Sequence, residues 1–181
     1  GSAIYAEHRP RADAACVALL KRAGMVVMGK TETTEFAALA PARTVNPHDP
    51  GHTPGGSSSG SAAAVADGMV WAALGTQTGG SVIRPASFCG CVGFKPSFGT
   101  INTAGLKPFS VSSDTIGVFA RRVIDAGWLV AELSARPELR VRGAAERAPR
   151  IALCRTAQRD QASAAAHAVL ETAAALARRA G

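Results

Sequence analysis

Aromatic residues are scarce in this chain. Phenylalanine, tryptophan and tyrosine together make up 5% of its 181 residues. The core must therefore be built from aliphatic side chains and alanine, which a hydrophobic content of 47% allows. This composition is typical of a folded globular chain and excludes a disordered one. The length is that of one domain, or of one domain with part of another.

Long apolar runs are also lacking. No run reaches the length of about 20 residues that crosses a bilayer. Near the N-terminus, Glu7, His8, Arg9 and Arg11 stand where a signal peptide would have its apolar stretch. We therefore expect a cytoplasmic protein with no membrane partner.

Cysteine is limited to four residues, as is histidine. Cys89 and Cys91 are separated by one glycine, which is closer than the usual spacing of metal ligands, and no histidine pair accompanies them. The sequence therefore predicts no metal site and no cofactor. We expect all four cysteines to be small buried hydrophobic residues: Cys16, Cys89, Cys91 and Cys154.

Acidic residues are fewer than basic ones, 13 against 20, so the formal net charge is +7. Most of the excess is arginine from Arg121 onward. These arginines are interspersed with alanine and glutamate, and after Arg136 no aromatic residue stands among them to stack on bases. The pattern indicates a solvated helix face, and we expect no nucleic-acid partner.

Short apolar runs alternate with stretches of helical spacing along the chain. Residues 41–56 form a loop rich in proline and glycine, and residues 136–149 form a polar linker. Short strands alternating with helices predict an α/β fold, with a mixed sheet flanked by helices. Helices are expected over 11–23, 62–66, 121–135 and 161–180, and strands over 25–28, 70–74, 91–94 and 150–154.

Residues 24–31 match the phosphate-loop pattern G-x-x-x-x-G-K-[ST] letter for letter. A phosphate loop follows a strand and needs a flexible backbone between its glycines. Here a helix comes first, and the residues between Gly24 and Gly29 are apolar and strand-like. Nucleotide binding at Lys30 is therefore the weakest hypothesis that we keep.

Residues 56–60 match G-x-S-x-G, the nucleophile elbow of the α/β-hydrolases. That elbow follows a strand directly, but prolines interrupt the segment before Gly56. His48 and His52 lie in the same loop, with Asp49 as the one nearby carboxylate. The sequence therefore disfavours a Ser-His-Asp triad.

Two loops rich in glycine and serine carry the strongest functional signal. The first, at 55–61, leads into an alanine-rich helix, and the second, at 78–81, follows an apolar run. Such loops expose backbone N–H groups and reach conformations closed to other residues. They supply the parts of an oxyanion hole or of an anion site, and composition alone leaves both open.

The wording and spacing of these loops resemble the amidase signature family, and residues 77–85 are most similar to its malonamidase-like bacterial members. The resemblance is strongest over about 24–120 and weaker over 136–181, so we expect residues 1–181 to be a partial amidase signature domain, incomplete at both ends. The matching segments are 54–66 and 74–86, with shorter ones at 29–37, 93–97 and 114–117.

The resemblance implies a Ser-cisSer-Lys mechanism. Ser81 would be the nucleophile, and Ser57, preceded by a cis peptide bond from Gly56, would relay its proton to a lysine base. Loss of one oxyanion-hole donor typically costs about 100- to 1,000-fold in rate. The oxyanion hole would be formed by four backbone N–H groups, those of Thr78, Gly79, Gly80 and Ser81.

Arg84 lies shortly after the implied nucleophile. In malonamidase-like members its counterpart contacts the substrate carboxylate, which suits a guanidinium group that can bind both oxygens. We therefore take Arg84 as a candidate substrate-binding residue. Structural support of the loop is the alternative role, and the sequence leaves the two open.

The lysine base of the family lies upstream of the first serine loop, at a spacing that places it before Gly1. A serine hydroxyl is a weak nucleophile until a base takes its proton. We therefore expect this chain by itself to hydrolyse amides feebly or not at all, and its incomplete sheet to aggregate or to depend on a partner. The lysines present do not match the base: Lys21, Lys30, Lys95 and Lys107.

The leading hypothesis is an amidase that cleaves a linear amide C–N bond of a small molecule through an acyl-enzyme on Ser81. The alternative within the family is an A-type component of an amidotransferase. The alternative of another class is a non-catalytic amidase fragment. A homo-oligomer is left open, and the sequence does not predict which amide is the substrate.

Overall fold

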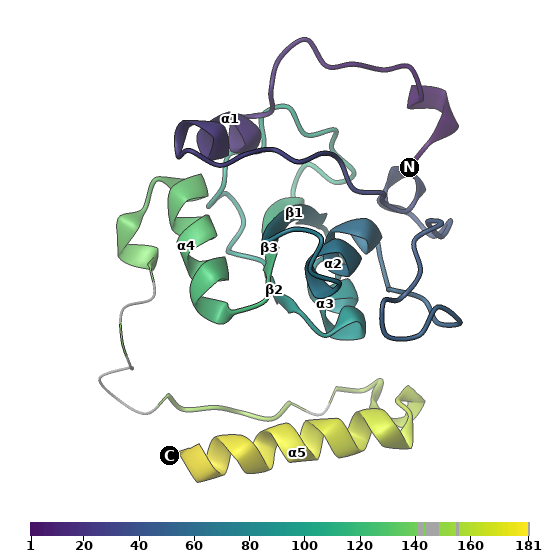
Figure 1. Cartoon of the computed structure of the whole chain (residues 1–181). Coiled ribbons are helices and arrows are strands. Elements are labelled where there is room, and N and C mark those ends of the chain that lie inside the picture. The colour runs from purple at the N-terminus through teal and green to yellow at the C-terminus, as the bar shows by residue number, and fades with distance from the viewer. Residues whose placement is uncertain (141–142, 144–148, 155, 181) are drawn as a thin grey trace. The chain divides into compact units, whose positions relative to one another are not determined.

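Strand β3, Thr115–Ala120, is buried along its whole length in the computed structural model (Figure 1). The structure describes residues 1–140, 143, 149–154 and 156–180, and the chain divides into two units, residues 1–141 and 142–181. In the first unit β3 pairs antiparallel with β1, Ala72–Gln77, and with β2, Val92–Phe94. The described sheet has the order β1-β3-β2, with β3 in the middle.

One face of β3 carries Ile116 and Val118, because successive side chains of a strand point to opposite faces. Both side chains belong to a buried cluster with α4, Val123–Ser134. Helix α1, Ala15–Arg22, packs on α4 and adds Leu20 to that cluster. The predicted helices over 11–23 and 121–135 are thereby confirmed, with shorter bounds.

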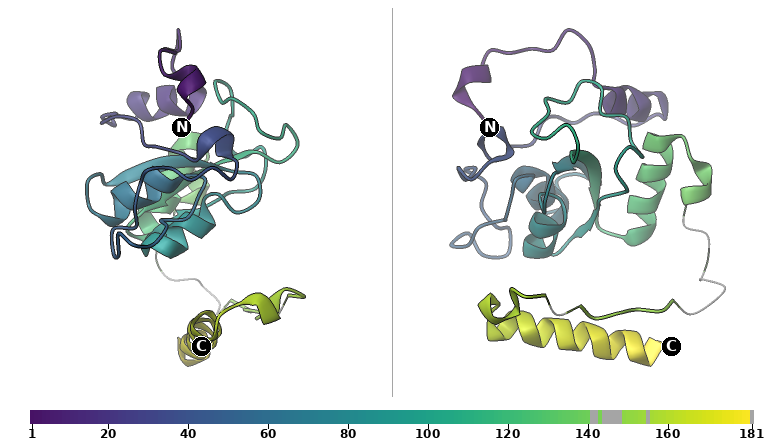
Figure 2. Two further views of the ribbon diagram at one scale, coloured as in Figure 1. Left: turned by 90° about the vertical axis from the view of Figure 1, so that its right-hand side faces the viewer. Right: turned by 180° about the vertical axis from the view of Figure 1, so that it is seen from behind.

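The other face of β3 carries Phe119, which is fully buried. It packs in a second cluster with α2, Ser59–Ala66, and α3, Ile83–Cys89. A layer of helices thus covers each face of the sheet, as the views from the side and from behind also show (Figure 2). This arrangement confirms the predicted α/β class.

Helix α2 consists almost entirely of serine, glycine and alanine, and it is buried. Its small side chains let it approach β1 closely, and Gly75 of β1 completes that fit. A Cβ atom at Gly75 would lie 2.6 Å from Ser58 Oγ and 2.6 Å from Phe119 Cε2. The position therefore has room for glycine alone.

Among its described residues the second unit contains one α-helix, α5, Ala164–Ala180, which confirms the predicted helix over 161–180. The strand predicted over 150–154 is wrong, because its described residues form no regular structure. A strand needs a neighbour to accept and donate its backbone hydrogen bonds. The described residues of this unit hold no other extended segment paired with it, so the apolar pattern alone does not make a strand.

The strand predicted over 25–28 is wrong for the same reason. Residues 25–28 have no regular structure, and Val26 and Met28 are 80% and 76% exposed. Conversely, α3 and the central strand β3 lie where the sequence predicted no element. Thr76 and Gln77, which lie beyond the end of the strand predicted over 70–74, belong to β1.

The remaining described elements are short 3-10 helices: Ala3–Tyr5, Glu35–Ala37, Pro137–Leu139 and Arg159–Gln161. All four cysteines are free. Cys16 and Cys89 are buried, but Cys91 is half-buried and Cys154 is exposed, so the prediction of four buried cysteines is wrong for Cys154. No helix in the described part of the chain is long and apolar enough to span a membrane.

We predict that Gly75→Ala lowers the free energy of unfolding by about 1–3 kcal/mol, because the added methyl group overpacks the contact between α2 and β1. Urea unfolding measures the change. The matched control is Gly29→Ala, since no atom lies within 4 Å of a Cβ atom there. Its expected change is within about 0.5 kcal/mol. Equal stability losses in the two variants would contradict this view of the packing.

Candidate active site

The two glycine- and serine-rich loops lie against each other, at the N-termini of α2 and α3. The backbone N–H of Ser58 donates to the carbonyl oxygen of Ser81 over 3.3 Å. The Ser58 hydroxyl accepts from the Thr76 N–H and donates to the Thr76 carbonyl, each over 3.3 Å. Ser58 thus joins the first loop both to the second loop and to the end of β1.

Ser57 is the buried residue at the centre of the first loop, 3% exposed, and its peptide bond with Gly56 is cis. The Thr34 N–H donates to the Ser57 carbonyl oxygen over 3.0 Å. The Thr34 methyl group lies so close to Gly56 that a Cβ atom there would be 2.8 Å from it. The Ser59 hydroxyl donates to the carbonyl of Gly55 over 2.7 Å. The backbone around Ser57 is thereby fixed on both sides.

The second loop is shaped by the buried side chain of Gln77. Its Oε1 atom accepts from the N–H groups of Val82 at 2.8 Å and Ile83 at 3.1 Å, and its Nε2 atom donates to the Gly79 carbonyl at 2.9 Å. One amide side chain therefore spans the loop from its start to the first turn of α3. Within the described part of the chain, the N–H groups of Gly79, Gly80 and Ser81 donate to no acceptor.

Asp114 holds the second loop from outside. Its carboxylate accepts from the Thr78 hydroxyl at 2.5 Å and from the N–H groups of Phe109 at 2.6 Å and Ser110 at 2.9 Å. Burial alone would raise the pKa of this carboxyl, but the hydrogen bonds from Thr78, Ser110 and Phe109 outweigh burial and hold it below 3.8. Asp114 is therefore ionised at neutral pH. Its contribution to stability is present above the pKa that this carboxyl has in the unfolded chain, and it is lost as the pH falls through the lowered pKa of the folded chain.

Arg84 lies on α3 beside the first loop. Its Nε atom donates to the carbonyl of Gly56 over 3.0 Å. The side chain also lines a cavity of about 250 Å³ that is bounded by residues between 38 and 44 and by residues 53–56. Among the described residues no carboxylate pairs with Arg84. The structure thus shows loop support, and it leaves the charge of the guanidinium group uncompensated at the cavity.

The hydroxyl groups of Ser57 and Ser81 have no hydrogen-bond partner among the described residues. The lysines do not reach them. Lys21 pairs with Asp13, Lys95 donates to the Pro96 carbonyl and Lys107 contacts Tyr5. No hydrogen bond from Lys30 to either serine is present in the described part of the chain.

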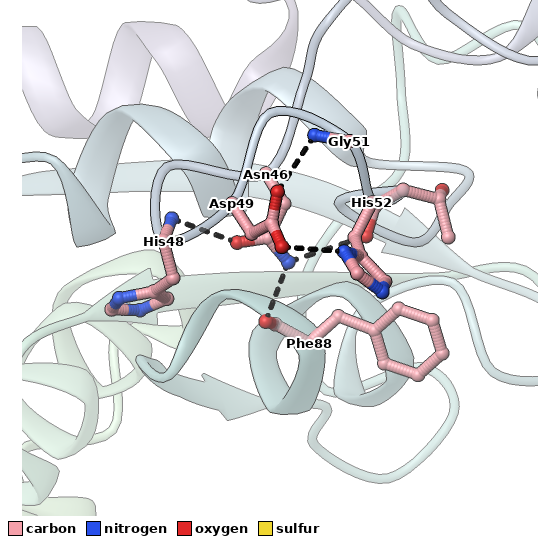
Figure 3. A network of polar contacts seen from close by, with 7 residues as sticks. Asn46, His48, Asp49, Gly51, His52 and Phe88 are labelled. Atoms are coloured by element: carbon pink, nitrogen blue, oxygen red, sulfur yellow. Dashed lines mark hydrogen bonds and ion pairs between the residues drawn. The ribbon is translucent and has the colours of Figure 1, made fainter.

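The loop that holds His48 and His52 is anchored to the end of α3 (Figure 3). Asn46 Nδ2 donates to the carbonyl of Phe88 over 2.9 Å, and His48 Nε2 donates to the carbonyl of Cys89 over 2.8 Å. Asp49 does accept a hydrogen bond from His52 Nδ1, but that pair is exposed and neither side chain contacts Ser57 or Ser81. A Ser-His-Asp triad is not assembled here.

Comparison with known proteins shows to which family a chain with this site belongs. The family model described as Amidase matches residues 1–181. This chain belongs to the amidase family.

Similar members of the amidase family include A-type components of glutamyl-tRNA(Gln) amidotransferases. The chain is 47% identical over 140 residues to the one from Oleidesulfovibrio alaskensis, covering 74% of this chain and 29% of that protein. The chloroplastic/mitochondrial counterpart from Arabidopsis thaliana is 46% identical, with 74% and 26% covered. The chain therefore spans less than a third of the length of these relatives.

Solved amidase-family structures confirm the fold. The A-type component of the Thermotoga maritima glutamyl-tRNA(Gln) amidotransferase superposes with a TM-score of 0.69 at 46% identity, over 73% of this chain and 30% of that one. The peptide amidase of Stenotrophomonas maltophilia gives a TM-score of 0.64 at 36% identity, over 74% of this chain and 31% of that one.

Several residues that shape this site carry no role in the sequence prediction: Thr34, Ser58, Gln77 and Asp114. The contacts of Gln77 are local, so a buried amide placed directly before a glycine turn was an available signal. Asp114 and Thr34 act over long sequence separations. No pattern within either segment indicates which loop it contacts.

We predict that Gln77→Met lowers the free energy of unfolding by about 1–3 kcal/mol, because it leaves the buried N–H of Val82 without an acceptor. Amide hydrogen exchange at Val82 and Ile83 should accelerate in parallel. The control is Gln158→Met at an exposed position, with an expected change within about 0.5 kcal/mol. Unchanged exchange at Val82 in the Gln77 variant would refute the role of this side chain.

Proposed function

We propose that this amidase-family chain carries the nucleophile and the oxyanion site for cleavage of an amide C–N bond. The observation that supports it most is the hydrogen bond from the Ser58 N–H to the Ser81 carbonyl, which joins the two serine loops. The N–H groups of Gly79, Gly80 and Ser81, which have no acceptor among the described residues, also support the proposal. Preorganised donors of this kind stabilise the negative oxygen of a tetrahedral intermediate.

In the proposed reaction, Ser81 Oγ attacks the amide carbonyl carbon. The hydroxyl proton passes through Ser57 to a base and then to the leaving nitrogen, which departs as an amine or ammonia. The acyl group remains on Ser81 as an ester, and water or another acceptor releases it. The resemblance implies lysine as that base, and none of this chain's four lysines contacts either serine. We therefore expect slow turnover from these residues alone.

Arg84 is proposed to bind a substrate carboxylate. Arg84 lines the cavity beside Gly56, and its guanidinium group has no carboxylate partner among the described residues. A planar guanidinium can bind both oxygens of a carboxylate. Its hydrogen bond to the Gly56 carbonyl fixes it close to Ser57, while its terminal nitrogens bond to none of the residues that the structure describes.

An A-type component of an amidotransferase is the second candidate function, and the relatives favour it. The Oleidesulfovibrio and Arabidopsis relatives both carry that name, while the solved structures also include a peptide amidase. The two functions share amide cleavage at Ser81 and differ in the fate of the nitrogen. A hydrolase releases it, whereas an amidotransferase passes it to an acceptor with the help of other protein chains.

We predict that a fluorophosphonate, an electrophile that reacts with nucleophilic serines, adds once to this chain, and slowly, because no lysine contacts Ser81 to take its proton. Ser81→Ala should abolish the adduct, because its oxygen is the proposed nucleophile, while Ser112→Ala at an exposed position should keep it. Intact-protein mass measures both. An adduct that persists in Ser81→Ala, or no adduct on the unmodified chain, would contradict the proposal for these residues.

Once the fluorophosphonate adduct on Ser81 is established, an amide substrate that carries ¹⁵N in its amide group distinguishes the two functions. Label recovered as free ammonia or amine from this chain alone supports the hydrolase. Label recovered in an acceptor, and only when the other chains of an amidotransferase are present, supports the second candidate.

A further inference from the structure

A buried carboxylate lies beside the second loop without a cation to neutralise it. Asp114 is 8% exposed, and among the described residues it forms no ion pair. Its three hydrogen bonds come instead from the Thr78 hydroxyl and from the N–H groups of Phe109 and Ser110. A buried charge is tolerated only where such donors compensate it.

The place of Asp114 in the sheet makes it a rigid anchor. It directly precedes β3, the buried central strand, and the last pair between β1 and β3 is Gln77 with Thr115. Thr78 and Asp114 are therefore the first residues beyond that pair on neighbouring strands. A hydrogen bond between them continues the connection between the strands into the loop that carries Ser81.

Two side chains thus restrain the second loop from opposite directions. Gln77 spans it from within, by its contacts with Gly79, Val82 and Ile83. Asp114 holds Thr78, the residue that opens the loop, from the neighbouring strand. Among the described residues, the N–H groups between these restraints have no acceptor, so their directions depend on what holds the rest of the loop. Besides the two side chains, that is the bond from the Ser58 N–H to the Ser81 carbonyl and the bond from the Arg84 N–H to the Gly80 carbonyl.

We propose that Asp114 is a positioning residue for the nucleophile: through the Thr78 hydroxyl, it holds the second loop so that the N–H groups of Gly79, Gly80 and Ser81 meet at one point. This inference rests on the proposed function of Ser81. A misplacement of about 1 Å at a reacting centre can cost about 100-fold in rate. The carboxylate therefore affects the reaction without touching the substrate.

The test compares Thr78→Val, Asp114→Asn and the double variant. Thr78→Val keeps the shape of the side chain and removes only the hydroxyl, while Asp114 retains its bonds to Phe109 and Ser110. Thr78→Ser restores the hydroxyl. The matched controls are Thr103→Val and Asp67→Asn, at exposed positions whose side chains form no hydrogen bond in the described part of the chain.

The readouts are the rate of fluorophosphonate labelling, measured well below the melting temperature, and hydrogen exchange of the Val82 and Ile83 amides, which bond to Gln77. Thr78→Val and Asp114→Asn should each slow labelling by about 100-fold. The double variant should be no slower than Asp114→Asn alone, and Thr78→Ser should recover most of the rate. Exchange at Val82 and Ile83 should accelerate in Thr78→Val and stay unchanged in both controls.

Labelling of folded Thr78→Val at the unmodified rate would overturn the inference, even if Asp114→Asn melts at a lower temperature. Additive losses in the double variant would overturn it too, because they would mean that Asp114 acts without Thr78. If the unmodified chain is not labelled, the proposed function fails for this chain. Hydrogen exchange then decides the positioning role, which unchanged exchange at Val82 and Ile83 in Thr78→Val would contradict.

Discussion

The contact between Ser58 and Ser81 is the interaction on which the site depends. Ser58 belongs to the first loop, yet its backbone N–H bonds to Ser81 and its hydroxyl bonds twice to Thr76 at the end of β1. The first loop, the second loop and the end of β1 therefore meet at one small residue, Ser58. A larger residue would separate the loops, and a residue without a hydroxyl would leave partly buried polar groups of Thr76 without this partner.

The fold supports this contact through close packing of small residues. Helix α2 approaches the sheet because Gly75 adds no side chain to the interface, and Phe119 fills the space beside it. The other face of β3 is filled by larger aliphatic side chains from α4. One face of the sheet thus supplies the bulk of the apolar core, and the other brings the backbones of the two loops within hydrogen-bond distance.

Sequence reasoning identified the loops because their information is local. Glycine, serine and alanine in a fixed order around Ser57 and Ser81 describe both a backbone conformation and a family. The same reasoning found α1, α4 and α5 from their helical patterns, and α2 from its run of alanines. It missed β3, whose Thr-Ile-Gly-Val-Phe-Ala sequence is too short to separate from a helical turn, and whose place in the middle of the sheet follows from pairing with distant segments.

The two strands that were predicted wrongly have a local pattern but no partner to pair with. Residues 25–28 and 150–154 have the apolar pattern of buried strands, but a strand forms only where a neighbour pairs with it. The contacts that restrain the site could not be predicted from local sequence either. Thr34, which bonds to Ser57, and Asp114, which bonds to Thr78, are each connected to the site by contacts across the chain that no local motif encodes.

The most direct measurement is a crystal structure of the chain after reaction with the fluorophosphonate. We expect phosphorus bonded to Ser81 Oγ, with the phosphoryl oxygen within hydrogen-bond distance of the N–H groups of Gly80 and Ser81. The Ser58 N–H should still bond to the Ser81 carbonyl. Phosphorus on another serine, or a first loop that lies apart from Ser81, would contradict the central claim that the two loops form one amide-cleaving site.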